Sequence, residues 1–455
     1  MSTVCAVSTP LAEGGLAVIR ISGEKALSAA AKIFVPFGGK RVADMPGYTC
    51  AYGRVVDPES GKAVDDAMLT VFRAPHSYTG EDTAEISCHG GIYIAKRILR
   101  LCLANGCRQA DRGEFTKRAF INGKLSLTQA EAVMDMISAR GELSLRSARL
   151  TREGVLFRRI DGIKSELVTL LGELAAWVDY PEEDLPAVED KALRATLSDA
   201  CEKLSALVRD YDCGMVLRRG IDTVIAGKPN VGKSTLMNML LGYERSIVTE
   251  TAGTTRDVIE ETVRLGDLEL KLSDTAGIRE TGDRIEQLGV SLAKKRLDEC
   301  ALIIAVFDTS SPLDGEDREL LSYLRGLNKR LIVVLNKSDL GSSADAGDFE
   351  GLRVTELSAK TGEGLEALTQ AVSELFGTDT YDADMTIFAN ERQKQCAEAA
   401  LEKLRTALSA AEQGETLDAV TVMTDAAVSE LMELTGERAS EAVVDEVFSK
   451  FCVGK

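Results

Sequence analysis

A nine-residue stretch, GKPNVGKST from Gly227 to Thr235, restricts the possible folds of this chain more than any other feature. It follows the apolar run DTVIA and leads directly into the helical sequence LMNMLLG. The pattern G-x-x-x-x-G-K-S between a strand and a helix is typical of a phosphate-binding loop in a parallel α/β sheet. Gly227 and Gly232 let backbone N–H groups turn toward phosphate oxygens. Lys233 then neutralises the β and γ phosphates, and the Ser234 hydroxyl coordinates magnesium.

Three further motifs follow this loop in order along the chain. The sequence LSDTAG ends an apolar run at Asp274 and Gly277. A carboxylate there can hold magnesium through water, and the glycine N–H can sense the γ phosphate. The sequences LIVVLNKSD and LSAKTGEG end two more such runs and carry Asn336, Lys337, Asp339, Ser358, Ala359 and Lys360.

These last two motifs select the base. The Asp339 carboxylate can accept hydrogen bonds from the N1–H and the amino group of guanine. Adenine offers neither donor there, and a buried unpaired carboxylate is costly. A backbone N–H in the Ser358–Lys360 segment can meet the guanine oxygen. The four ordered motifs therefore predict a guanine-nucleotide switch domain.

The residue that positions the attacking water is not evident from the motifs. GTPases of the Ras type carry a glutamine just after D-x-x-G, but this chain has Ile278, which cannot hydrogen-bond. The nearby polar residues are open candidates or a solvated helix face: Glu280, Asp283, Glu286 and Gln287. The switch segment TETAGTTRD contains one arginine, Arg256. The Asn230 side-chain oxygen could instead bind a monovalent ion that bridges the phosphates and replaces an arginine finger.

Length and periodicity predict a chain of several domains, since 455 residues suffice for roughly three. Residues 1–120 mix short β-like runs with helical stretches, as an α+β domain does. Residues 121–216 and 379–455 show helical periodicity, and residues 217–378 alternate strand and helix. We therefore expect one all-α domain to be interrupted by an inserted α/β domain. Thr128 and Glu131 have the spacing of a capping box at the first helix.

Composition limits the possible environments and partners. The net charge of −18 argues against a surface that coats nucleic acid, so any RNA contact must be local or supplied by a partner. Basic pairs such as Lys117 and Arg118 are expected to be solvated faces. The ten cysteines form no C-x-x-C pair, which favours reduced thiols. No apolar run approaches the length of a membrane helix, and the start has no signal-peptide pattern, so a cytoplasmic location is expected without a membrane partner.

Taken together, the motifs resemble one family. The sequences GKPNVGKST, AGTTRD, DTAG and NKSD, the divided helical domain, RISG, GED with HGG, RAF with NGK, and the terminal C-x-G-K are similar to the MnmE (TrmE) family of tRNA modification GTPases. This resemblance implies a homodimer formed through N-terminal tetrahydrofolate-binding domains. It also implies an FAD-containing partner, MnmG, with which the enzyme adds a carboxymethylaminomethyl or aminomethyl group to carbon 5 of the wobble uridine in certain tRNAs. GTP hydrolysis is expected to need potassium-driven pairing of two G domains.

The resemblance also assigns roles to individual residues. It implies potassium ligands at Asn230, Thr249, Thr251 and Thr254, magnesium ligands at Ser234 and Thr255, and a water-orienting acid at Glu286. It places the folate site at Arg20, Glu85, Lys124 and Lys455. The GTP-binding residues are expected to be Asn230, Val231, Gly232, Lys233, Ser234, Thr235, Thr249, Glu250, Thr251, Ala252, Gly253, Thr254, Thr255, Asp274, Thr275, Ala276, Gly277, Asn336, Lys337, Asp339, Ser358, Ala359 and Lys360.

The role of Cys452 and the class of function each allow more than one interpretation of the sequence. Cys452 either finishes a core contact as a small apolar residue or takes part in catalysis at the flexible C-terminal tail. A different class of function is a ribosome-assembly or regulatory GTPase whose N-terminal domain only docks a partner. A third is a folate-binding scaffold with an inactive nucleotide site. Folate uptake and GTP turnover separate these possibilities.

Overall fold

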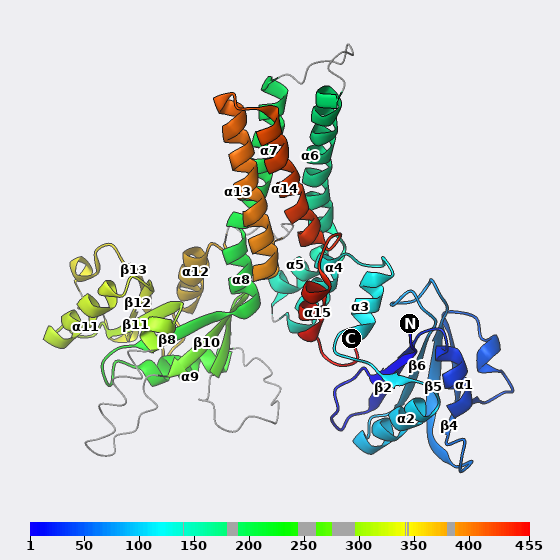
Figure 1. The fold of residues 1–455 in the computed structure, drawn as a ribbon. Coiled ribbons are helices and arrows are strands. Elements are labelled where there is room, and N and C mark those ends of the chain that lie inside the picture. Colours follow the sequence, from blue (N-terminus) through cyan, green and yellow to red (C-terminus); the bar gives the residue numbers. More distant parts are fainter. Residues whose placement is uncertain are drawn as a thin grey trace, which may run out of the picture. The chain divides into compact units, whose positions relative to one another are not determined.

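The computed structural model describes residues 1–139, 141–179, 190–243, 261–274, 296–341, 343, 345–379 and 387–455 (Figure 1). The chain forms two compact units. The first combines Met1–Met134, Thr151–Ser205 and Glu391–Lys455, and the second combines Asp135–Leu150 and Ala206–Asn390. Among the described residues, no helix combines the length and apolar character that a membrane crossing needs.

The N-terminal part of the first unit is built on a seven-stranded sheet with the order β3-β4-β5-β6-β2-β1-β7. All pairs are antiparallel except β1 with β7. Three of the β-like runs in the sequence become β2, β5 and β6. The strands are β1 (Val4–Val7), β2 (Leu16–Ser22), β3 (Phe34–Pro36), β4 (Thr49–Val56), β5 (Ala63–Phe72), β6 (Thr83–His89) and β7 (Arg108–Gln109).

Two helices, α1 (Ala26–Ile33) and α2 (Ile92–Ala104), share one apolar core with this sheet. On α2, Ala95, Ile98 and Cys102 recur at helical intervals and are buried, which fixes the face that points inward. A short 3₁₀ turn, Val42–Asp44, and helix α3 (Glu114–Ile121) complete the domain. The α+β class expected for this region is confirmed.

The remaining helices of the first unit come from two distant parts of the sequence. Helices α6 (Val155–Asp179) and α7 (Asp190–Arg209) lie beside α13 (Glu391–Gln413) and α14 (Leu417–Thr435) in Figure 1. Helix α14 packs against both α13 and α6. Helix α15 (Glu441–Ser449) packs its Val444, Val447 and Phe448 against the start of α4 (Leu127–Ser138). The divided all-α domain is therefore confirmed.

The predicted capping box at Thr128 and Glu131 is wrong. Ser126 caps α4 instead: its hydroxyl accepts from the N–H of Gln129 (3.3 Å), and the Gln129 side chain accepts from the N–H of Ser126 (2.9 Å). Thr128 is buried within the helix, and Glu131 accepts from Arg392 at 2.9 Å. The S/T-x-x-E/Q spacing begins at Ser126 and again at Thr128. Only the burial of Thr128 shows which of the two residues caps the helix.

The second unit contains a six-stranded sheet with the order β13-β12-β11-β8-β10-β9. The first five are parallel neighbours, and β9 is antiparallel to β10. The strands are β8 (Ile221–Ala226), β9 (Glu261–Leu265), β10 (Leu268–Asp274), β11 (Leu302–Asp308), β12 (Arg330–Asn336) and β13 (Arg353–Leu357). The inserted α/β class is thereby confirmed.

Helices cover both faces of this parallel sheet. Helices α9 (Lys233–Tyr243) and α12 (Leu365–Phe376) share one apolar core with it, and α8 (Tyr211–Arg219) adds Leu217 to the same core. Helix α11 (Gly315–Gly326) packs Leu321 and Leu324 into a second core on the opposite face. Strands buried on both faces explain the continuous apolar runs of β11 and β12. Helix α5 (Glu142–Arg152) and the 3₁₀ turns Ser338–Leu340 and Ala346–Phe349 are the other elements.

Candidate functional site

The phosphate-binding loop lies between β8 and α9, as the sequence predicts. Its backbone needs left-handed or otherwise unusual conformations at three positions, with φ of 154° at Gly227, 64° at Asn230 and 97° at Gly232. A Cβ at residue 227 would lie 2.4 Å from the Val306 carbonyl oxygen, so a side chain there would displace β11 from the loop. Asn230 is one of the residues that tolerate a left-handed conformation.

Lys233 and Ser234 begin helix α9 immediately after the loop. The ammonium group of Lys233 donates to the carbonyls of Gly227 (2.8 Å) and Lys228 (2.6 Å), so it lies across the mouth of the loop. Ser234 and Thr235 are exposed at the first turn of α9. The free N–H groups and positive dipole end of a helix attract phosphate there, and an exposed serine hydroxyl suits magnesium.

Asn336, at the end of β12, holds two loops together. Its side-chain amide donates to the carbonyl of Val231 (2.8 Å) in the phosphate loop. Its side-chain oxygen accepts from the N–H of Ala359 (2.9 Å) after β13. Asn336 is only 2% exposed, so these bonds are not replaced by water. The asparagine therefore fixes the distance between the phosphate loop and the base-recognition segment.

Asp339 and Ser358, which the sequence predicts to recognise the base, are in direct contact. The buried Ser358 hydroxyl donates to a carboxylate oxygen of Asp339 at 2.7 Å, while Asp339 itself is exposed. The Asp339 carboxylate is thus oriented by the Ser358 hydroxyl and is still exposed to solvent. Lys337 has φ of 66° and donates to Asp308 at 2.6 Å. Burial raises the pKa of Asp308, but hydrogen bonds from Lys337 and Ser310 outweigh it and hold the pKa below its usual value.

Asp274 ends β10 beside the phosphate loop, because it pairs with Ile225 of the parallel strand β8. The other expected nucleotide and metal residues lie outside the described residues. They are Thr249, Glu250, Thr251, Ala252, Gly253, Thr254, Thr255, Thr275, Ala276, Gly277 and the water-orienting candidate Glu286.

A second group of predicted residues meets on the N-terminal domain. Arg20 on β2 pairs with Glu85 on β6 across the sheet, and their side chains form an ion pair at 2.8 Å. The Arg20 guanidinium also lies over the rings of Tyr78 (5.7 Å) and Phe115 (5.5 Å). A cation, a carboxylate and two aromatic rings are thus gathered at one place.

The C-terminal tail joins this group. The N–H of Phe115 donates to the backbone carbonyl of Lys455 at 3.1 Å, and Ser8 donates to the carbonyl of Gly454 at 3.0 Å. Val453 forms a β-bridge with Arg112. Gly454 has φ of 96°, and a Cβ there would lie 2.3 Å from the Val7 carbonyl oxygen. The tail therefore requires glycine at this position, and Phe115 connects Lys455 to Arg20.

Lys124, the fourth predicted folate residue, is held differently. Its ammonium group donates to the carbonyl of Pro75 at 3.1 Å. Pro75 belongs to the segment between β5 and β6 that also carries Tyr78. Arg20 and Glu85 are thus in direct contact, while Lys455 and Lys124 are linked to them through Phe115 and this segment respectively.

An ion-pair network around Arg118 was not predicted from the sequence. Arg118 was expected on a solvated face, but it is 3% exposed and donates to Glu81 (2.9 Å), Glu114 (2.8 Å) and the Ser2 carbonyl (2.7 Å). Burial raises the pKa of Glu114, yet hydrogen bonds from Arg108, the Asp111 N–H and Arg118 outweigh it and lower the pKa. Glu81 and Arg118 belong to the GED and RAF sequences. These two motifs were the signal in the sequence that could have pointed to this ion pair.

Cys452 differs from the other described cysteines near the tail. It is exposed, whereas Cys5, Cys88 and Cys107 are buried. Burial raises the pKa of the Cys88 thiol to about 11, so little thiolate forms there at neutral pH. Phe451 is buried in the core and Cys452 is exposed, so the structure does not support the alternative in which Cys452 finishes a core contact.

Comparisons with known proteins agree with this arrangement. The family model described as "MnmE helical domain" matches residues 127–452, and the model "GTP-binding protein TrmE N-terminus" matches residues 3–124. Proteins named "tRNA modification GTPase MnmE" from Carboxydothermus hydrogenoformans and Thermoanaerobacter pseudethanolicus are each 40% identical, and one from Acetivibrio thermocellus is 39% identical. Each comparison covers 100% of this chain and 99% of the relative. The chain therefore belongs to the MnmE family of tRNA modification GTPases.

Proposed function

We propose that this chain is a potassium-dependent GTPase that works with MnmG on the wobble uridine of certain tRNAs. The product is a carboxymethylaminomethyl or aminomethyl group on carbon 5, and the carbon comes from a tetrahydrofolate. The observation that carries this proposal is the position of the tail: the backbone of Lys455 is bonded to Phe115, whose ring lies against Arg20. A GTPase without folate chemistry would not need Lys455 close to Arg20 and Glu85.

In the proposed nucleotide site, Asp339 accepts from guanine while Ser358 holds the carboxylate in place. Lys233 leaves the loop carbonyls and moves to the β and γ phosphates. Ser234 and Thr255 are the magnesium ligands, and Asn230, Thr249, Thr251 and Thr254 are the potassium ligands. When bound, these cations would neutralise charge on the phosphate groups of GTP. Glu286 orients the attacking water.

In the proposed folate site, Glu85 accepts from the donor edge of the pterin, and Arg20, Lys124 and Lys455 bind the negatively charged glutamate tail. The Tyr78 and Phe115 rings add flat surface for the pterin. Cys452 is exposed in the C-terminal tail of the chain and is proposed as a catalytic residue.

The partners proposed are a second copy of the chain, MnmG with its FAD, and tRNA, all in the cytoplasm. The N-terminal sheet supports a homodimer, since Phe37, Tyr52 and Met68 expose 45%, 55% and 40% of their surface on or beside β4 and β5. The domains follow the ranges 1–120 for folate binding and dimerisation, 121–216 and 379–455 for the helical domain, and 217–378 for GTP hydrolysis.

Nucleoside analysis tests the proposal most directly. Cells that lack this protein should contain tRNA with unmodified wobble uridines, and the wild-type gene should restore the modification. A variant with Arg20→Ala should fail to restore it while retaining GTP turnover. Unchanged wobble uridines in the deletion strain would contradict the proposal.

A further inference from the structure

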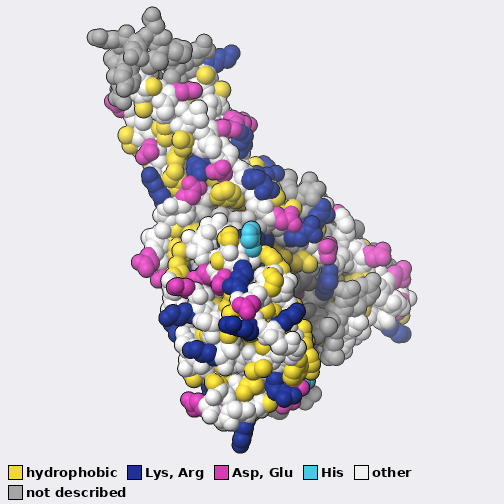
Figure 2. Space-filling view, turned by 90° about the vertical axis from the view of Figure 1, so that its right-hand side faces the viewer, with side chains coloured by type: hydrophobic (Ala, Val, Ile, Leu, Met, Phe, Trp, Pro, Cys, Tyr) yellow, Lys and Arg dark blue, Asp and Glu magenta, His cyan; other side chains and the backbone are white. Residues whose placement is uncertain are grey.

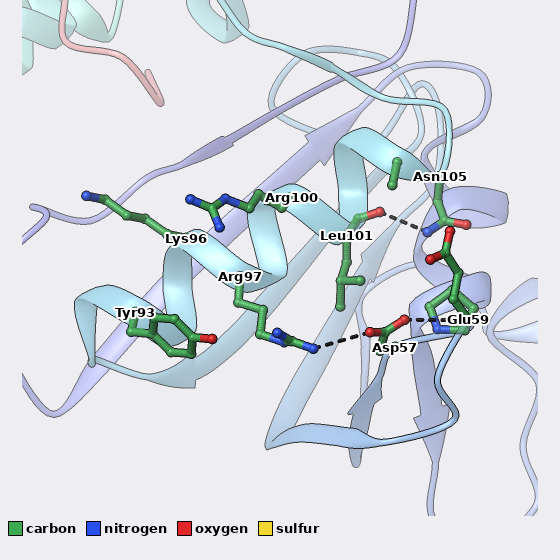
Figure 3. Close-up of a pocket in the computed structure, with 10 residues that line it drawn as sticks. Asp57, Glu59, Tyr93, Lys96, Arg97, Arg100, Leu101 and Asn105 are labelled. Carbon is green, nitrogen blue, oxygen red and sulfur yellow. Dashed lines mark hydrogen bonds and ion pairs between the residues drawn. The ribbon is translucent and has the colours of Figure 1, made fainter.

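The N-terminal domain has a hollow that the proposed folate and nucleotide sites do not use. It has a volume of about 480 Å³ and lies between helix α2 and the turn that joins β4 to β5. Figure 3 shows Tyr93, Lys96, Arg97 and Arg100 on the helix, with Asp57 and Glu59 on the facing turn.

The cations on this helix differ in their partners. Arg97 donates to Asp57 at 3.2 Å, so its charge is compensated. The Glu59 N–H also donates to Asp57 at 3.0 Å, which keeps the carboxylate in place. The side chains of Lys96 and Arg100 are exposed, and neither forms an ion pair or hydrogen bond with any residue that the structure describes. Figure 3 shows both extending to the side of α2 away from Asp57.

Tyr93 adds an aromatic group to the same stripe of the helix. Residues three and four apart lie on one helical face, so the positions 93, 96 and 100 follow each other along α2. Tyr93 is 71% exposed. The opposite face of α2 is buried through Ala95, Ile98 and Cys102, so packing does not explain the outward residues.

We propose that Tyr93, Lys96 and Arg100, here called the α2 surface, contact a single-stranded segment of the tRNA. Cations track a nucleic-acid backbone, and an aromatic ring stacks on an unpaired base. The proposal rests on the proposed function, which makes tRNA a partner, and it adds the place of contact. The acidic Glu59 on the facing turn limits the contact to the outer side of α2.

The charge of the whole chain restricts any RNA contact of this protein to a local one or to one supplied by a partner. A net charge of −18 opposes non-specific attraction of RNA to the surface. Figure 2 shows basic and acidic side chains interspersed across the face it displays. A few uncompensated cations beside a stacking group can still bind RNA, because contacts beyond about 10 Å are screened by salt.

The test compares charge reversals in the full-length protein. Lys96→Glu with Arg100→Glu should weaken the binding of fluorescently labelled tRNA at least tenfold at 0.1 M salt. The slope of log affinity against log salt should fall by about 1.4, since each phosphate contact on a single strand contributes about 0.7. Lys25→Glu with Lys40→Glu is the matched control, because both lysines are exposed and the charge change is equal. Its effect should stay within about threefold.

Tyr93 provides an independent measurement. Tyr93→Ala should weaken binding roughly tenfold without changing the salt slope, and Tyr93→Phe should restore it, because stacking needs the ring rather than the hydroxyl. Thermal unfolding of the full-length variants reports that the N-terminal domain is folded, and binding is measured with and without MnmG.

The outcomes separate this proposal from the proposed function. If the α2 reversal weakens tRNA binding no more than the control while the wild-type protein restores wobble modification, the α2 surface is wrong and the function stands. If the reversal leaves tRNA affinity unchanged but prevents association with MnmG, the surface binds protein and the proposal is also wrong. A wild-type protein that restores no modification overturns both.

Discussion

The side-chain amide of Asn336 donates to the carbonyl of Val231 at 2.8 Å, and this bond joins the end of strand β12 to the phosphate loop. The two residues are 105 positions apart in the sequence. Because the same side chain also accepts from Ala359, one asparagine sets the relative position of three nucleotide-binding segments.

Replacing Asn336 by alanine should therefore destabilise the nucleotide site itself. The change leaves the Val231 carbonyl and the Ala359 N–H without their buried partner, at a cost of about 2–4 kcal/mol. Hydrogen exchange should show faster exchange at β8, β12 and the residues after β13, and GTP affinity should fall. Asn238→Ala on the exposed side of α9 is the control. Equal protection of the backbone amides from hydrogen exchange in both variants would contradict the proposed role of Asn336 in holding these segments together.

Replacing Asp339 by asparagine should change the base preference. The amide keeps one acceptor but places a donor where guanine also donates, so GTP affinity should fall about 10–150-fold from the loss of a charged hydrogen bond. Xanthosine triphosphate carries an oxygen in place of the guanine amino group and should bind the variant better than GTP. Calorimetry with both nucleotides measures this. A variant that keeps its preference for GTP would show that Asp339 does not read the base.

Replacing Asn230 by glycine should remove potassium activation and leave the loop intact. Glycine adopts the φ of 64° without strain, whereas alanine would add a backbone penalty to the loss of the side chain. Wild-type hydrolysis should fall sharply when sodium replaces potassium, since the smaller ion does not satisfy the same oxygen ligands. The variant should hydrolyse GTP slowly in either salt. A wild-type rate that is equal in both salts would remove the ion from the mechanism.

Replacing Glu286 by alanine should slow hydrolysis by about 10²–10⁴-fold and leave GTP affinity nearly unchanged, because the residue acts on water in the transition state. Single-turnover hydrolysis and nucleotide binding are measured separately. Glu280→Ala and Gln287→Ala are the controls, since they remove polar groups from the same segment. If either control loses as much activity as Glu286→Ala, the role belongs elsewhere in the segment.

Replacing Lys455 by alanine separates the contribution of the Lys455 side chain from that of the Lys455 backbone. The Phe115 N–H bonds to the Lys455 carbonyl, so the tail should stay in place while folate affinity falls. Removing residue 455 altogether should also lose the backbone bond and lower the stability of the N-terminal domain. Calorimetric titration with a tetrahydrofolate and thermal unfolding measure the two effects. Unchanged folate affinity in Lys455→Ala would exclude the lysine from the site.

Local sequence was sufficient to predict the nucleotide loop and the divided architecture. The Gly227–Thr235 pattern specifies a turn that only a few backbone conformations satisfy, and the same conformations are found in the structure. The apolar run before Asn336 predicted β12, because parallel strands are buried on both faces. The helical periodicity of residues 121–216 likewise predicted helices there, among them α6.

Long-range contacts could not be predicted in the same way. Arg118 was placed on a solvated face because nothing near it in sequence shows that Glu81 and the Ser2 carbonyl surround it. The capping box was misplaced because its pattern fits two neighbouring positions and only tertiary burial separates them. Family resemblance alone suggested that Lys455 shares a site with Arg20, and the bond between its backbone and Phe115 was not predicted.

The β-bridge between Arg112 and Val453 joins the N-terminal domain to a segment that follows the whole nucleotide-binding sheet in the sequence. A fragment that ends before this sheet therefore cannot form the bridge or the bond between Phe115 and Lys455. The N-terminal domain should consequently unfold at a lower temperature when it is expressed alone than within the full-length chain.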